Sequence, residues 1–566
     1  MSGKPTKVAY DGIQGLLAVA TDDGELHVYG QRQIDFVFTL EQKTIIRQMT
    51  FVMGKYILLV DQLNRIITIS LESREFYKMR TQPFKITCLE TDPILPWVLL
   101  GLADGTILVY DVVEDRVSNY MINDLQKLNF FKGAKTSEVI SIQWNPRDLG
   151  TILISYKYVT ILYSLVEKAI KQSFVYELPP YAPGGDYSFD VTKRRNPKVI
   201  QSLFHPNSLF ILTVHDDNSL VFWDVNTGKL IQARTLFDED INIPVYGLKK
   251  LSQPELPHIL KASWICQSNS EYTTLLIANG PSDIDSSAQG LVMIDFGRTP
   301  FYSFNSYDSV SAYFLKATQQ KLLPIQNKSA IRDFVSIATE TPFFNGNHNP
   351  QMIVVLLHNG EIETLSYPMR HFIHNGALFP QGVNWIWPQT TKVQAVDVNE
   401  EVWQHLNNVS QQELGILEGG YLTTDVGNNH SGCSKTDSHT LLITGHSNGM
   451  VRVWNTKNDQ HNGNKVFEVD TSRVLNIGIG KAVKHISFEA ENLEMSVATE
   501  NGDVVFYKFE ANQFYNEQSL TFNQELVTKF RRFSLADTDS VLVNVRDSAP
   551  PHIKYGFMPH FAIHSR

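Results

Sequence analysis

The stretch that decides the fold reads Leu16-Leu17-Ala18-Val19-Ala20-Thr21-Asp22-Asp23-Gly24-Glu25-Leu26-His27-Val28-Tyr29. Two strands with one apolar face flank a polar Asp-Asp-Gly turn, a pattern that predicts a β-hairpin. Similar units recur at 98–111, 209–224, 352–366, 441–455 and 495–509. The first three turns, near Asp23, Asn64 and Asp104, are about 40 residues apart, the length of one four-stranded propeller blade. The sequence therefore predicts an all-β repeat protein with the fold of a β-propeller.

Composition excludes several other classes of protein. With 43% hydrophobic residues, the 566-residue chain can bury more than one core. Its net charge of −10, from 49 basic and 59 acidic residues, argues against a nucleic-acid binder. Cys88, Cys266 and Cys433 lie far apart, so neither a disulfide framework nor a zinc site is indicated. Without a signal peptide or a run of 18 apolar residues, we expect a cytoplasmic protein.

Seven blade-like units can be placed in the first two thirds of the chain. They cover residues 16–38, 46–80, 86–120, 139–164, 199–234, 262–296 and 331–366. The fifth unit carries Trp223-Asp224, the dipeptide that gives WD repeats their name. Seven blades commonly close a ring. We therefore expect a complete seven-bladed propeller over residues 1–380.

The remaining third of the chain, residues 381–566, predicts an incomplete second propeller of about two to three blades. Its expected parts are a strand at 393–398, a flexible loop near 407–438, units at 441–468 and 483–509, and a strand at 540–545 that begins a tenth unit. Such a partial ring leaves strand edges open to pairing.

One insertion interrupts the repeat after the fourth unit, where Leu178-Pro179-Pro180-Tyr181-Ala182-Pro183-Gly184-Gly185-Asp186 cannot continue a central strand because proline cannot donate to the ladder. Loops on rigid scaffolds are where binding residues concentrate. The candidate partner-binding loop consists of Pro183, Gly184, Gly185, Asp186, Lys193, Arg194 and Arg195. The three cations could meet an acidic partner, although a solvated loop is the simpler interpretation.

A basic amphipathic helix is predicted near the end of the chain, over residues 525–535. Leu526, Phe530 and Phe533 recur at helical spacing. Such a helix can touch anionic lipid, and phosphorylation at its end would weaken that attraction. The candidate phosphosite is Ser534, which follows Arg531 and Arg532. The alternative is a linker helix that packs its apolar face between blades.

No catalytic, metal-binding or cofactor-binding residue is predicted. Gly445-His446-Ser447-Asn448-Gly449 matches the pattern of a hydrolase nucleophile, but an alternating strand follows it, so we interpret it as a blade turn. His205, Asp216, Asp217 and Trp223 are expected to form a buried hydrogen-bond network that fixes a turn. Phosphate-loop and metalloprotease motifs are absent from the sequence. A propeller enzyme would instead need acids or histidines clustered at the central channel.

Three stretches resemble a known family. They are the opening at 10–21 with 24–30, the insertion at 179–186, and the segment 545–559. The chain is similar in these stretches to the lethal giant larvae and tomosyn family, and within it to the yeast Sro-type polarity proteins. The resemblance implies two seven-bladed propellers and a C-terminal tail, and this chain departs from it by ending inside the second propeller.

The same resemblance implies a non-enzymatic scaffold for SNARE-dependent fusion of secretory vesicles, active in polarised exocytosis and cell polarity. The implied partners are a plasma-membrane t-SNARE of the Qbc type, a vesicle Rab GTPase in its GTP form and an exocyst subunit. Its implied location is the cytoplasm and, peripherally, the plasma membrane at sites of polarised secretion. The alternative is a generic WD-repeat adaptor in a cytosolic complex unrelated to membrane fusion.

Overall fold

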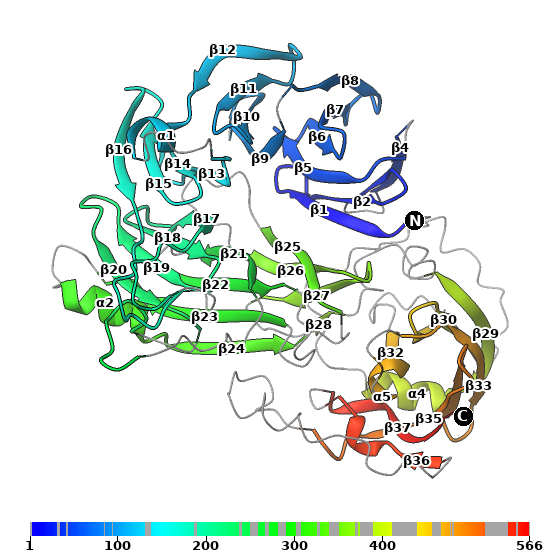
Figure 1. Cartoon of the computed structure of the whole chain (residues 1–566). Coiled ribbons are helices and arrows are strands. Elements are labelled where there is room, and N and C mark those ends of the chain that lie inside the picture. Colours follow the sequence, from blue (N-terminus) through cyan, green and yellow to red (C-terminus); the bar gives the residue numbers. More distant parts are fainter. Residues whose placement is uncertain are drawn as a thin grey trace.

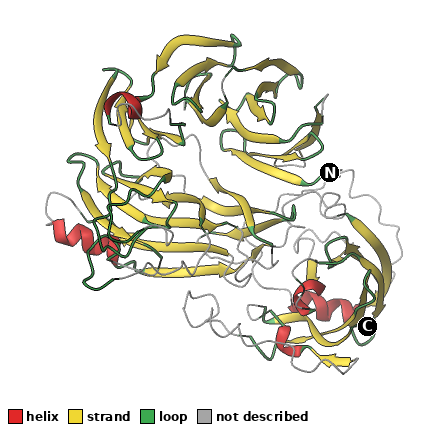
Figure 2. Ribbon diagram, viewed as in Figure 1, coloured by secondary structure: helices red, strands yellow, loops and turns green. Residues whose placement is uncertain are grey.

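The structure is a computed structural model in which strands predominate (Figures 1 and 2). It describes residues 3–30, 34–40, 43–83, 85–92, 94–130, 137–185, 190–236, 240–248, 258–266, 271–280, 290–300, 307–324, 329–338, 350–367, 372–373, 389–409, 438–455, 466–475, 477, 480–515, 542–550 and 553–564. These residues form antiparallel sheets in chain order, as the repeated hairpins predict.

The first seven sheets each have four strands, and in each the strands pair with their neighbours in chain order. The first four sheets are formed by β1 (Pro5–Asp11), β2 (Leu16–Thr21), β3 (Glu25–Gly30) and β4 (Ile34–Thr39); β5 (Ile46–Val52), β6 (Tyr56–Asp61), β7 (Arg65–Ser70) and β8 (Phe76–Thr81); β9 (Ile86–Thr91), β10 (Trp97–Leu102), β11 (Ile107–Asp111) and β12 (Arg116–Ile122); and β13 (Ser141–Asn145), β14 (Asp148–Ser155), β15 (Thr160–Ser164) and β16 (Ala169–Phe174). The next three are formed by β17 (Val199–Phe204), β18 (Phe210–His215), β19 (Leu220–Asp224) and β20 (Leu230–Arg234); β21 (Ile259–Cys266), β22 (Tyr272–Asn279), β23 (Gly290–Arg298) and β24 (Gln319–Pro324); and β25 (Ile331–Ala338), β26 (Pro350–Leu357), β27 (Ile362–Ser366) and β28 (Phe372–Ile373).

These seven sheets close into a ring. Their first strands contact one another in sequence from β1 through β5, β9, β13, β17 and β21 to β25, and β25 contacts β1 again (Figure 1). The closing contact is apolar. Val8, Leu17 and Val19 of the first sheet pack against Met352 and Val354 of the seventh. The predicted seven-bladed ring is therefore confirmed.

The turns follow from local chemistry. Gly24 and Gly105 both have positive φ, at 86° and 88°, which glycine adopts without steric cost. At Gly105 the need is also spatial, because a Cβ there would lie 2.6 Å from the Asp124 carboxyl carbon. Asp124 in turn caps α1, since its carboxylate accepts from the Lys127 amide at 3.0 Å. One turn residue and one cap thus fix the corner between two sheets.

Helices are few among the described residues. They are the α-helices α1 (Leu125–Asn129), α2 (Tyr307–Leu315), α4 (Glu400–Val409) and α5 (Thr471–Val474), and the short 3₁₀ helix η5 (Arg546–Ser548). The sequence patterns missed α2, which lies between β23 and β24 and packs Phe314 against Phe222 with ring centroids 4.3 Å apart. They also missed α4. The predicted loop near 407–438 lies almost wholly outside the described residues, which end at Val409 of α4 and resume at Ser438 of β30.

Two further sheets follow the ring in the chain, and we call them the second unit. One contains β29 (Thr390–Asn399), β30 (Ser438–His446), β31 (Met450–Asn455) and β32 (Val466–Asp470), and the other has β33 (Val483–Glu489), β34 (Glu494–Thr499), β35 (Val504–Ala511), β37 (Tyr555–Ile563) and β36 (Leu542–Asn544) in that order. The prediction that residues 540–545 begin a tenth unit is wrong. β36 pairs with β37, which pairs with β35, so both belong to the ninth sheet.

Burial distinguishes the ring from the second unit. In the ring, every residue of β18 is buried because a neighbouring sheet covers each face. In the ninth sheet, β34 alternates between buried Met495, Val497 and Thr499 and more exposed Glu494, Ser496 and Ala498. One face of that sheet packs on the eighth in a shared apolar cluster, and the other is more exposed and carries polar side chains together with Phe506 and Phe561. The partial second propeller is thus two packed sheets in the described residues.

Candidate functional site

The inserted loop between β16 and β17 is held by a buried arginine. Arg195 is 5% exposed, and its guanidinium donates to the carbonyl oxygens of Gly184 and Ala182, both at 2.6 Å, and of Pro179 at 3.3 Å. A charged donor that satisfies several backbone acceptors is a strong structural link. Arg195, predicted to meet a partner, is therefore placed as the internal brace of the loop.

A second loop, from the connection between the fifth and sixth sheets, packs onto this one. The Gly184 amide donates to the Ile241 carbonyl at 2.8 Å, and the Val245 amide donates to the Tyr181 carbonyl at 2.9 Å. Together they display an apolar surface made of Tyr181, Ile243, Val245 and Tyr246, of which Tyr246 is fully exposed. We call these four residues the paired-loop surface. Exposed aromatic side chains of this kind are frequent anchors at protein interfaces.

The other residues of the predicted partner-binding loop surround this brace. Lys193 and Arg194 are solvent-exposed and pair with Asp190 at 4.0 Å and Glu177 at 2.5 Å. Such exposed ion pairs contribute little to stability, so both cations remain available to a partner. Pro183 is half-buried, Gly184 is buried, Gly185 has φ of 105°, and Asp186 lies outside the described residues.

The ring's inner strands carry charge where an enzyme would need acids or histidines. The buried Asp333 of β25 accepts from Lys7 of β1 at 2.6 Å and from Lys261 of β21 at 2.8 Å. Burial alone would raise the pKa of Asp333, but the two lysines outweigh it and hold the pKa below its usual value. This ion triad links the first, sixth and seventh sheets. No group of three or more metal-ligating side chains occurs in the described part of the chain.

The predicted acid and histidine cluster around the WD dipeptide is structural. Trp223 Nε1 donates to Thr213 Oγ1 at 2.9 Å, and the same hydroxyl bonds His215 Nε2 at 2.9 Å. His205 is completely buried, and burial lowers its pKa to about 3. Burial raises the pKa of Asp217 to about 6, while Asp216 accepts from the Lys198 amide at 2.8 Å. These groups have structural partners, as predicted, but the described hydrogen bonds do not join the four residues in one network. Trp223 is bonded to Thr213, His205 accepts from the Asn207 amide at 3.1 Å, and Asp217 accepts from the Ser219 amide at 3.0 Å.

The stretch that matches a hydrolase nucleophile lies between two strands. β30 ends at His446 and β31 begins at Met450, so Ser447 stands in a hairpin turn closed by a hydrogen bond from the Gly449 amide to the His446 carbonyl at 3.2 Å. A nucleophile elbow requires a helix after the serine. The interpretation as a blade turn is confirmed.

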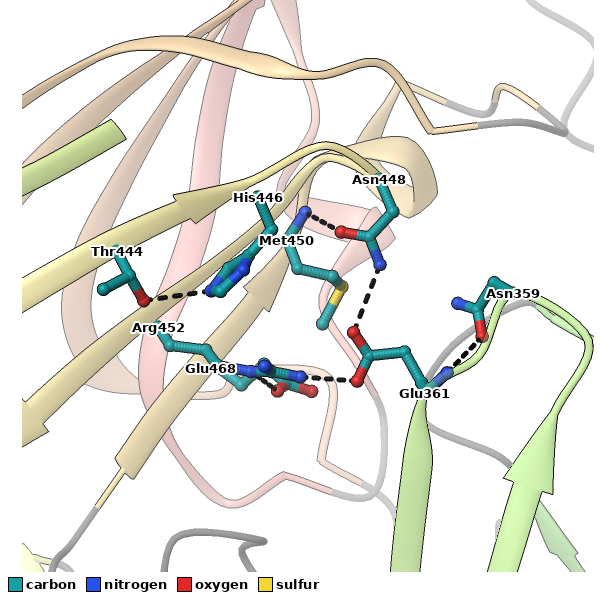
Figure 3. A network of polar contacts seen from close by, with 8 residues as sticks. All are labelled: Asn359, Glu361, Thr444, His446, Asn448, Met450, Arg452 and Glu468. Carbon is teal, nitrogen blue, oxygen red and sulfur yellow. Dashed lines mark hydrogen bonds and ion pairs between the residues drawn. The ribbon is translucent and has the colours of Figure 1, made fainter. Parts of the chain in front are cut away.

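The same turn takes part in the contact between the ring and the second unit (Figure 3). Glu361, just before β27 of the ring, accepts from Arg452 Nη2 of β31 at 2.5 Å and from Asn448 Nδ2 of the β30–β31 turn at 3.4 Å. Arg452 Nε also donates to Glu468 of β32 at 2.7 Å. We call Glu361, Arg452 and Glu468 the junction cluster.

The junction cluster is almost fully buried. The side chains of Arg452 and Glu361 are 2% and 5% exposed, and that of Glu468 is 18% exposed. Sequence reasoning missed it, because Glu361 and Arg452 are 91 positions apart and each follows an ordinary Asn-Gly turn. Nothing in the local pattern distinguishes these charges from those on any exposed hairpin.

Comparison with known proteins identifies the relatives of the chain. The family model described as "Lethal giant larvae (Lgl) like, C-terminal" matches residues 481–566. The Saccharomyces cerevisiae protein named Lethal(2) giant larvae protein homolog SRO77 is 45% identical over 566 residues, all of this chain and 55% of that protein. The chain is similar to the lethal giant larvae proteins. The resemblance read from residues 10–30, 179–186 and 545–559 is confirmed.

Two further proteins are similar to the chain at lower identity. An uncharacterized Schizosaccharomyces pombe protein is 23% identical over 526 residues, which are 89% of this chain and 51% of the relative. The rat Lethal(2) giant larvae protein homolog 1 is 20% identical over 488 residues, 80% of this chain and 41% of the relative. The chain thus spans about half the length of the curated relatives it matches.

The predicted amphipathic helix with Ser534, Arg531 and Arg532 lies outside the described residues. Among the described helices, none is long and apolar enough to cross a bilayer.

Proposed function

We propose that this chain is a non-enzymatic scaffold that regulates SNARE-dependent docking and fusion of secretory vesicles at the plasma membrane, in polarised exocytosis and cell polarity. Its partners in this proposal are a plasma-membrane t-SNARE of the Qbc type, a vesicle Rab GTPase and an exocyst subunit. The observation that carries the proposal is the 45% identity, along the whole chain, to a yeast lethal giant larvae homologue.

The fold is compatible with a binding role. A closed ring of packed blades is a rigid support, and rigid supports hold binding loops in fixed positions. The paired-loop surface gives such a support an exposed contact area, with Tyr246 as its most accessible side chain. The cations Lys193 and Arg194 lie on the same inserted loop and could meet acidic residues of a SNARE helix.

The test is a pulldown with the purified chain, shown to be monodisperse by size-exclusion chromatography. The prey are the cytosolic domain of a Qbc-type t-SNARE, and a vesicle Rab loaded with a GTP analogue or with GDP. Capture of the t-SNARE, together with Rab capture that depends on the GTP analogue, is the expected result. A folded chain that captures neither protein would overturn the proposal and favour the generic WD-repeat adaptor.

A matched pair of variants then locates the contact. Tyr246→Ser removes the fully exposed ring of the paired-loop surface, and Tyr272→Ser removes a half-exposed tyrosine from β22. If the t-SNARE docks on the paired-loop surface, Tyr246→Ser weakens capture about tenfold or more, as expected for an aromatic anchor. Tyr272→Ser leaves capture unchanged. Equal capture by both variants would place the contact elsewhere on the chain.

A further inference from the structure

The junction cluster buries two carboxylates against one guanidinium. Glu361 comes from the ring, whereas Arg452 and Glu468 come from the second unit, so the charge balance is completed only when the two parts meet (Figure 3). With both acids ionised, the cluster carries one surplus negative charge. Burying an uncompensated charge is unfavourable, and a carboxyl group in that position gains a proton instead.

No buried apolar cluster in the described residues joins the ring to the second unit. Each of these apolar clusters lies within the ring or within the second unit. Across the contact, Glu361 accepts hydrogen bonds from Arg452 and, at 3.4 Å, from the Asn448 amide. The protonation state of the cluster therefore bears directly on the strength of the contact.

The environment of Glu361 gives the direction of the effect. Burial raises its pKa to about 7, and the neighbouring Glu468 adds to the rise, while Arg452 opposes it without cancelling it. The groups that act on Glu361 include Arg452 of β31, Glu468 of β32 and the neutral amide of Asn448 in the β30–β31 turn. A second buried acid, Glu363, follows two positions later in β27. His446 of β30 is buried nearby and is bonded to Thr444 at 3.0 Å.

We propose that the junction cluster is a proton-linked latch, which takes up one proton when the second unit docks on the ring and so strengthens their contact as pH falls below neutrality. The sign follows from linkage. The docked state binds the proton more tightly than a separated state in which the carboxyl group has its ordinary pKa of 4.5. Docking therefore strengthens as pH falls from above 7 toward 4.5, and it levels off below that value. The inference is independent of any vesicle-fusion role.

Hydrogen exchange measured by mass spectrometry tests the latch. The informative peptides cover the β26–β27 turn of the ring and the β30–β31 turn of the second unit, at pH values from about 5.5 to 8.5 that bracket the proposed transition. Rates are divided by the intrinsic exchange rate at each pH. In the parent chain, protection of both peptides rises as pH falls, by up to about tenfold per pH unit because a single proton is taken up.

Three substitutions decide the outcome. Glu361→Gln and Glu468→Gln each remove one of the two acids, from opposite sides of the junction, and each is expected to flatten the pH dependence. Glu494→Gln is the matched control, because Glu494 pairs with Lys508 at 2.8 Å on the exposed surface of the same unit. It keeps the pH dependence of the parent. A flat parent profile, or a pH dependence that survives both junction variants, would overturn the proposal.

Arg452→Met supplies an independent check at fixed pH. It leaves two buried carboxylates facing each other, so protection of the β26–β27 peptide at pH 8 is expected to fall at least tenfold, although the substitution lies in the other unit. Unchanged protection in a folded variant would mean that the cluster does not hold the two parts together.

Discussion

Replacing Arg195 by methionine tests whether the inserted loop is a braced element or an ordinary solvated loop. The substitution keeps much of the buried apolar stem but removes the donors that reach the Gly184, Ala182 and Pro179 carbonyls. A hydrogen bond from a charged group contributes about 1.5–3 kcal/mol. Three bonds from one group are not additive, so the expected loss is about 2–4 kcal/mol for opening of the loop.

Hydrogen exchange at the Gly184 and Val245 amides measures that loss, because these amides join the inserted loop to its partner loop at 2.8 and 2.9 Å. A loss of 2–4 kcal/mol corresponds to about 30- to 800-fold faster exchange. Arg194→Met is the matched control, because the Arg194 side chain is 76% exposed and its substitution should leave both amides unchanged. Parent-like protection of Gly184 and Val245 in Arg195→Met would refute the brace.

Two further substitutions probe the ring. Asp333→Asn leaves Lys7 and Lys261 facing a neutral amide at the ring closure. Because both lysines are about a third exposed, we expect the free energy of unfolding to fall by about 2–3 kcal/mol at pH 7, measured as a lower urea midpoint. The fold lowers the pKa of Asp333, so its contribution to the free energy of unfolding is complete above its ordinary pKa of 3.8 and is lost as pH falls through the lowered pKa. The difference in stability between the parent and Asp333→Asn must therefore disappear in acid. A gap that widened in acid would contradict the triad. Phe314→Ala removes a fully buried aromatic ring of α2 from the cluster around Phe222. The free energy of unfolding, measured by heat or urea, should fall by about 3–5 kcal/mol. A loss below about 1 kcal/mol would show that α2 is not part of the core.

Local chemistry explains why so much of the ring could be predicted. A blade is a run of hairpins, and a hairpin is specified within about 15 residues by a turn that needs glycine or asparagine and by the side-chain alternation of its strands. Asn64, with φ of 63°, and Gly105, with φ of 88°, occupy such turns. The structural role of Trp223 was predictable from the WD dipeptide, but its partners Thr213 and His215 were not among the residues predicted for its network.

The sequence-based predictions were wrong where the position of an element depends on residues far away in the chain. The strand at 542–544 has the composition of a blade's first strand, but its place was decided by β37, which lies between it and β35. The helices α2 and α4 are likewise stabilised by burial against sheets that the local pattern does not reveal, as the packing of Phe314 and of Trp403 illustrates.

The sequence alone determined the all-β class and the seven repeated units of the ring. It also determined the role of the Gly445–Gly449 turn and the family resemblance. What only the tertiary structure decided is the role of individual charges. Lys193, Arg194 and Arg195 are neighbours in the chain, yet two are solvated and the third is a buried brace. Glu361 and Arg452 meet across 91 positions. Strand alternation is a property of neighbouring residues, whereas burial of a charge depends on which distant surface covers it.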